Sequence, residues 1–127
     1  MKHIDLLLKV TDLSKSLPYS LDVSDSEVAL LSLSIPKTFE NSISYMKVRA
    51  NFIASQAMNE GQKLLSIVPT HDNDSSLHLL YEPRTPIFRE TVGGCISSLD
   101  FEIFDENNQA IDFSEGEIMI ILCFRKK

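Results

Sequence analysis

The strongest constraint on the fold is a period-two alternation of apolar and polar residues that recurs along the chain. Residues 3–10, 44–54 and 96–104 each place apolar side chains at every second position over most of their length. Side chains two apart point to the same face of a strand, whereas a helical face repeats every 3.6 residues. These three segments are therefore predicted to be strands with one buried face.

The segment 27–36 shows the alternation most clearly. Leu31, Leu33 and Ile35 are expected to share its buried face. Pro36 is expected to close the strand, because proline has no backbone N–H to donate to a sheet. Further strands are predicted at 63–68, 77–81 and 117–125, with turns at 59–61 and 105–108 and loops at 14–26 and 70–76.

About eight antiparallel strands follow from this pattern, with no helical segment stronger than the weak stretch at 54–58. A chain of 127 residues and 14.3 kDa fits one compact domain spanning 1–127. The predicted fold is all-β, a single jelly-roll sandwich or barrel. We prefer a jelly roll to an immunoglobulin-like sandwich partly because the chain has no Trp and no Cys-Trp-Cys spacing.

The charge balance disfavours nucleic acid as a partner. Eighteen Asp and Glu residues against twelve Lys and Arg give a net charge of −6, whereas phosphate-backbone binding needs clustered cations. No membrane span is expected, because the longest apolar run, 118–124, falls far short of roughly 18 residues. Asp5 and Lys9 interrupt what would be the apolar part of a signal peptide, so we expect synthesis in a host cytoplasm.

No residue pattern points to catalysis, a metal or a cofactor. His3, His71 and His78 occur in no nucleophile motif, and residues 71–74 offer one imidazole and two carboxylates with no second cluster. Cys95 and Cys123 form no C-x-x-C and are expected to be buried free thiols. The sequence thus predicts a protein that is not an enzyme.

A few apolar residues are expected on otherwise polar surfaces. Leu7, Met119 and Ile121 fall on the outward positions of their predicted strands, so they are possible subunit contacts unless a second sheet or a loop covers them. Pro83 and Pro86 hold residues 82–86 extended, and this arm is a further possible contact.

Two stretches carry a family resemblance. The letters EVAL at 27–30, LSIP at 33–36 and FEN at 39–41 resemble an "E-V-A-L … I-x-Y-P … N-I" segment of the capsid-type proteins encoded by Polinton (Maverick) elements and by adintovirus-like double-stranded DNA viruses. Residues 105–116 and 122–125 resemble the "D-x-x-G-x-x-I-D-F-x-x-G" turn and "L-H-F-R" strand end of the same family. Cys123 departs from the family His, and the middle segment of the longer family members is absent here.

The resemblance implies a structural virion protein, a minor capsid or penton-like vertex protein of a double-stranded DNA virus or virus-like transposon. It would be located in the virion and assemble with itself, as a pentamer in preference to a trimer, and with other capsid proteins. The alternative is a β-sandwich binding module, such as a spike that recognises a receptor or glycan through the loops at 14–26 and 70–76. Glycan-binding sites usually offer several aromatic side chains, and Tyr19 is the only aromatic residue in those loops, so glycan recognition is less favoured. A hydrolase or metal enzyme on a β-barrel would need a His and carboxylate cluster that the spacing does not offer.

Overall fold

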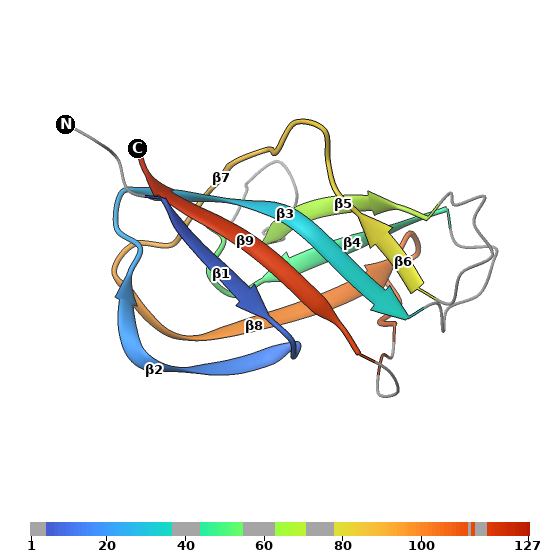
Figure 1. The fold of residues 1–127 in the computed structure, drawn as a ribbon, viewed down its shortest axis with the longest axis horizontal. Coiled ribbons are helices and arrows are strands. Elements are labelled where there is room, and N and C mark those ends of the chain that lie inside the picture. Colours follow the sequence, from blue (N-terminus) through green and yellow to red (C-terminus); the bar gives the residue numbers. More distant parts are fainter. Residues whose placement is uncertain (1–4, 37–43, 55–62, 71–77, 112, 114–116) are drawn as a thin grey trace.

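The fold is a sandwich of two antiparallel sheets in a computed structural model (Figure 1). The structure describes residues 5–36, 44–54, 63–70, 78–111, 113 and 117–127. The described residues form nine strands and no helix: β1 (Leu6–Val10), β2 (Ser14–Asp22), β3 (Ser26–Pro36), β4 (Tyr45–Ala50), β5 (Leu64–Pro69), β6 (His78–Tyr81), β7 (Arg89–Glu90), β8 (Cys95–Asp105) and β9 (Met119–Lys126). The predicted all-β architecture is therefore confirmed.

One sheet has the order β1-β9-β3-β6, and the short strand β7 pairs with β3 beyond the end of β6. The other sheet has the order β2-β8-β4-β5. The pairs are nested in the sequence: β1 with β9, β2 with β8, β3 with β6 and β7, and β4 with β5. All of these pairs are antiparallel.

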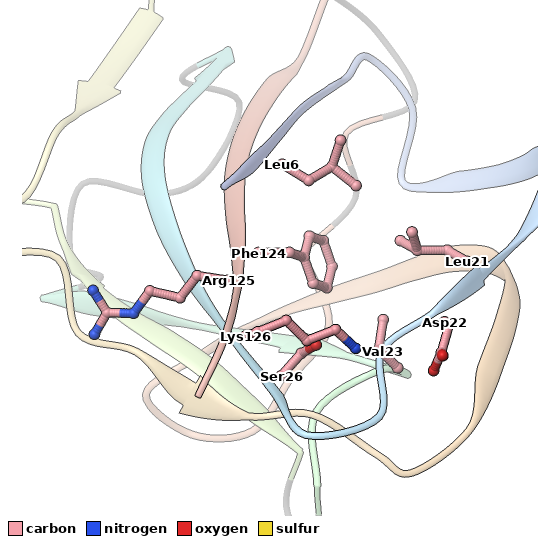
Figure 2. A pocket seen from close by; sticks show the side chains of 8 residues that line it. All are labelled: Leu6, Leu21, Asp22, Val23, Ser26, Phe124, Arg125 and Lys126. Atoms are coloured by element: carbon pink, nitrogen blue, oxygen red, sulfur yellow. The ribbon is translucent and has the colours of Figure 1, made fainter. Parts of the chain in front are cut away.

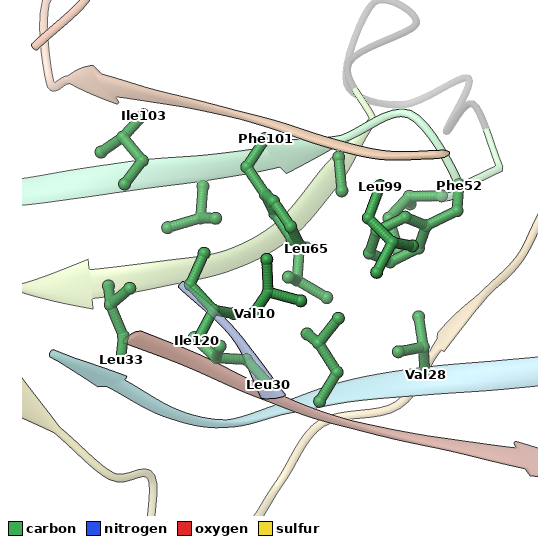
Figure 3. Packing of buried hydrophobic residues seen from close by; sticks show 14 of the residues in the cluster. Val10, Val28, Leu30, Leu33, Phe52, Leu65, Leu99, Phe101, Ile103 and Ile120 are labelled. Carbon is green, nitrogen blue, oxygen red and sulfur yellow. The ribbon is translucent and has the colours of Figure 1, made fainter. Parts of the chain in front are cut away.

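The core fills the space between the two sheets (Figure 3). Strands with one face on this core show the predicted alternation, as in β8, where Leu99, Phe101 and Ile103 are buried. Phe52, in the turn after β4, is fully buried, and its ring contacts Phe101 of its own sheet and Phe124 of the other. These three rings join the two sheets near one end of the core.

Two predictions about strand positions are wrong. Residues 14–26 do not form one loop, because β2 occupies 14–22 and pairs antiparallel with β8. Leu31 does not share the buried face of Leu33, because the register between β3 and β9 shifts between Leu30 and Ser32. This β-bulge inserts Leu31 as an extra residue, so Leu30 takes the inward position instead.

Candidate interaction surface

The outer face of the β1-β9-β3-β6 sheet carries rows of apolar and small side chains across its strands. Leu7 of β1 lies opposite Cys123 of β9, which in turn lies opposite Ala29 of β3. These positions alternate with the core-facing ones, so they point away from the interior. Leu7 is 62% exposed.

The next rows continue the same surface toward β6. Ile121 of β9 lies between Lys9 and Ser32, and Ser34 of β3 lies between Met119 and Leu80. Leu80 is 59% exposed, and Met119 and Ile121 are partly exposed. We call the face formed by Leu7, Cys123, Ala29, Ile121, Ser32, Met119, Ser34 and Leu80 the outer apolar face. Its central members Ala29, Ser32 and Cys123 are buried, whereas Leu7 and Leu80 at its two sides are exposed.

Three of the five predicted subunit contacts therefore come together: Leu7, Met119 and Ile121 all belong to the outer apolar face. Neither another sheet nor a loop covers Leu7, since most of its surface is exposed. Pro83 and Pro86 lie on the segment between β6 and β7, outside the paired strand positions that form these rows, and both are partly exposed.

Among the members that the sequence prediction did not name, Leu80 is the large exposed hydrophobic residue. The sequence does contain the information needed to place it, because two adjacent leucines in a strand must face opposite sides. Leu79 is buried in the core, so Leu80 points outward. Residue 80 thus extends the face as far as the edge strand β6.

A charged cluster borders the outer apolar face at the end near β7. Glu27 and Arg125 are directly opposite each other on β3 and β9, and Arg125 Nε donates a hydrogen bond to Glu27 Oε1 at 2.7 Å. The Arg125 guanidinium carbon lies 3.4 Å from the centre of the Phe88 ring, a cation–π contact. The ion pair and the cation–π contact therefore form the border of the outer apolar face at the end near β7.

The two thiols have different environments. Cys123 is buried within the outer apolar face, and this burial, with the nearby Asp5 carboxylate, raises the pKa of its thiol above the ordinary value of 9.0. Cys95 is exposed at the start of β8, so the prediction that both cysteines are buried is wrong for this residue. Cys95 precedes the buried Ile96 in β8, so it takes the outward position of the strand, which explains the exposure.

The outer face of the other sheet mixes polar and apolar side chains, because Lys47 of β4 lies between Ile67 of β5 and Phe104 of β8. The Asp100 carboxylate of β8 accepts hydrogen bonds from the Ser14 hydroxyl at 2.6 Å and the Ser98 hydroxyl at 3.0 Å. The Asp100 backbone N–H also donates to Asn51 Oδ1 at 2.9 Å. Asp100 therefore ties β2, β8 and the turn after β4 together, which is a structural role for a carboxylate.

An apolar recess of about 180 Å³ opens between β2 and the β1-β9 end of the first sheet (Figure 2). Leu6, Leu21 and Phe124 point into it, and Asp22 and Lys126 lie at its rim. The rim charges already have local partners. Lys126 Nζ donates to the Ser24 carbonyl oxygen at 2.6 Å, and hydrogen bonds from Ser24 lower the pKa of Asp22 below its ordinary value of 3.8.

The described residues contain no group of three or more His, Cys, Asp and Glu side chains that could hold a metal ion. The one candidate cluster from the sequence, at 71–74, lies outside the described residues, as does most of the predicted loop at 70–76. Among those same described residues, no helix is long and apolar enough to span a membrane.

The sequence matches no known protein-family model, and no curated protein is significantly similar to it.

Proposed function

We propose that the sandwich is a jelly roll. The nested pairing of β1 with β9, β2 with β8, β3 with β6 and β7, and β4 with β5 supports this topology, because a jelly roll is a long antiparallel hairpin rolled into two sheets. If β6 and β7, which pair with opposite ends of β3, are counted as one interrupted strand, the strands number eight.

We further propose that the protein is a structural virion protein, a minor capsid or penton-like vertex protein of a double-stranded DNA virus or virus-like transposon. A jelly roll does not by itself define a function, because lectins and cupins also use it. The observation that carries the proposal is the outer apolar face, with Leu7 and Leu80 each more than half exposed. Exposed apolar surface of sufficient size marks interaction sites, and here the exposed residues flank Ala29, Ser32 and Cys123, which are themselves buried. The resemblance to Polinton and adintovirus-like capsid proteins supports the virion assignment.

In this proposal the partners are further copies of the same chain and other capsid proteins, with a pentamer preferred to a trimer. The chain would act by association, without catalysis or a cofactor. The alternative of a β-sandwich binding module draws on the apolar recess between β1 and β2, which offers a small concave surface. It is weakened because residues 14–22, expected to form a binding loop, form the strand β2.

The experiment is the molar mass of the purified chain by light scattering on a sizing column over a range of concentrations. We expect a pentamer, five times 14.3 kDa. A trimer would favour a spike instead, and a strict monomer at all concentrations would contradict self-assembly.

Two charge substitutions localise the contact. Leu7→Glu and Leu80→Glu place a carboxylate on the outer apolar face at exposed positions, so we expect both variants to be smaller than the wild-type assembly while remaining folded. Tyr19→Glu is the matched control, because Tyr19 is 50% exposed on β2 of the other sheet. An assembly unchanged by Leu7→Glu and Leu80→Glu would show that this face is not the interface.

A further inference from the structure

A second concave surface lies at the opposite side of the sandwich, between β5 and the segment that joins β6 to β7. Its first wall is the consecutive run Leu65, Ser66 and Ile67 of β5, and Leu30 of β3 also lines it. Among the described residues, the strands that pair with β5 are limited to β4, so residues 65–67 have no described strand along their second backbone edge. We call this surface the edge groove.

The second wall of the edge groove has a regular pattern. Every second residue from Tyr81 to Arg89 lines it, so this extended arm presents one face to the groove along its length. Pro83 therefore lines the groove, whereas Pro86, three residues later, does not. Ile67 and Ile87 are 49% and 62% exposed, so apolar surface remains open on both walls.

One polar group in the groove has no partner. Arg89 Nε is buried, yet it forms no hydrogen bond. The adjacent carboxylate, Glu90, follows Arg89 directly in β7, so it faces the opposite side of the strand, where it accepts a hydrogen bond from Lys127 Nζ at 2.9 Å. A buried N–H without an acceptor is costly, so this guanidinium favours a ligand that brings an oxygen acceptor, and a carboxylate most of all.

The dimensions distinguish between classes of ligand. The cavity has a volume of about 180 Å³. Pockets for drug-sized ligands measure roughly 300–1,000 Å³, so this one is small for a cofactor-sized molecule and suited to one or two side chains. An unpaired strand edge can add an extended segment through backbone hydrogen bonds, with alternate side chains entering a pocket beside it.

From these observations we propose that the edge groove binds an extended acidic peptide segment of a partner protein. The segment would run beside residues 65–67 of β5, place an aliphatic side chain between Ile67 and Ile87, and pair a carboxylate with Arg89. The proposal does not depend on the outer apolar face, which belongs to a different side of the molecule.

The test is selection of random heptapeptides, displayed on phage, against the immobilised wild-type chain and against two variants. Arg89→Met removes the guanidinium and keeps an apolar stem. Thr85→Trp fills the groove from an exposed position, so it tests the site even if Arg89→Met destabilises the fold. Thr11→Trp, at an exposed position between β1 and β2, is the matched control.

We expect enriched peptides in which Asp or Glu lies close to an aliphatic residue. Synthetic copies should bind wild type and Thr11→Trp equally, and should lose at least tenfold in affinity on Arg89→Met, on Thr85→Trp, or when the peptide Asp is replaced by Asn. Amide chemical shifts of residues 65–67 and 85–89 should move on binding. The proposal is overturned if no peptide is enriched, if the enriched peptides lack an acidic residue, or if they bind both groove variants as well as wild type.

Discussion

The three-ring contact between the sheets makes a quantitative prediction about stability. Phe52 is fully buried, and its ring centre lies 5.6 Å from that of Phe101 and 5.4 Å from that of Phe124. Replacing a buried Phe by Ala costs about 3–5 kcal/mol. Leucine retains much of the volume but loses both ring pairs, each worth about 0.5–1.5 kcal/mol, so Phe52→Leu should lower the free energy of unfolding by about 1–3 kcal/mol.

Urea unfolding measures this difference, and the slope against denaturant should stay unchanged if only the native contact is lost. A double-mutant cycle of Phe52→Leu with Phe124→Leu isolates the contact between the sheets, and its coupling should be about 0.5–1.5 kcal/mol. Tyr19→Leu, an exposed aromatic site on β2, should change stability by less than about 0.5 kcal/mol. A coupling below about 0.3 kcal/mol, the scatter expected for independent sites, would refute the idea that these rings join the sheets.

Three further predictions concern reactivity, pH and a turn. In the native protein the exposed Cys95 should react with a maleimide, whereas Cys123, which is buried and has a raised pKa, should react only after unfolding. Rapid labelling of both thiols in the native protein would contradict this. The pairing with Lys127 lowers the pKa of Glu90 below 4.5 and raises that of Lys127 above 10.5. Its stabilising effect should therefore be lost as the pH falls through the lowered pKa or rises through the raised one, and unfolding curves of Lys127→Met should lack both changes. Asn108 has φ +64°, so Asn108→Val should cost about 1–2 kcal/mol in thermal unfolding, whereas Asn108→Gly should cost less; equal melting points would count against backbone strain.

The strands that alternation predicts from the sequence are those with one face on the core. β4 and β8 each have a neighbour on both sides in their sheet, and their inward residues are almost completely buried. Burial on one face selects apolar residues at every second position, so the alternation directly reports the environment of such a strand. β9 is different, because it is apolar at successive positions from Met119 to Phe124 and was predicted from that continuous run. It was predicted at 117–125 and lies at Met119–Lys126.

β2 could not be predicted for the same physical reason. It lies at the edge of its sheet, and none of its nine residues is fully buried. Its two partly buried residues, Leu17 and Leu21, are four apart, and the register with β8 shifts between Ser16 and Leu21. An exposed, irregular edge strand leaves no period of two in the sequence, and its serines and Pro18 are typical of a loop.

The candidate surfaces were predictable to different degrees. The outward positions of Leu7, Met119 and Ile121 follow from alternation within single strands, without knowledge of which strands are neighbours. The edge groove depends on which strands lie at the two edges and on how the arm packs beside β5. Proline content predicted that residues 82–86 are extended, but nothing local in the sequence predicts that Arg89 Nε is left without a partner.

The outer face of the β2-β8-β4-β5 sheet carries hydrogen-bonded charged groups beside the exposed Ile67, and these charged groups favour one orientation in the proposed assembly. On the β2-β8-β4-β5 sheet, Lys47 Nζ donates to Asn108 Oδ1 at 2.7 Å, and Asp100 accepts two serine hydroxyls. Moving such hydrated groups into an interface costs free energy, whereas apolar surface gains about 25 cal/mol per Å² buried. The outer apolar face should therefore contact the neighbouring copy. Lys47→Glu should leave the mass of the assembly unchanged where Leu7→Glu reduces it, and the reverse result would assign the contact to the β2-β8-β4-β5 sheet.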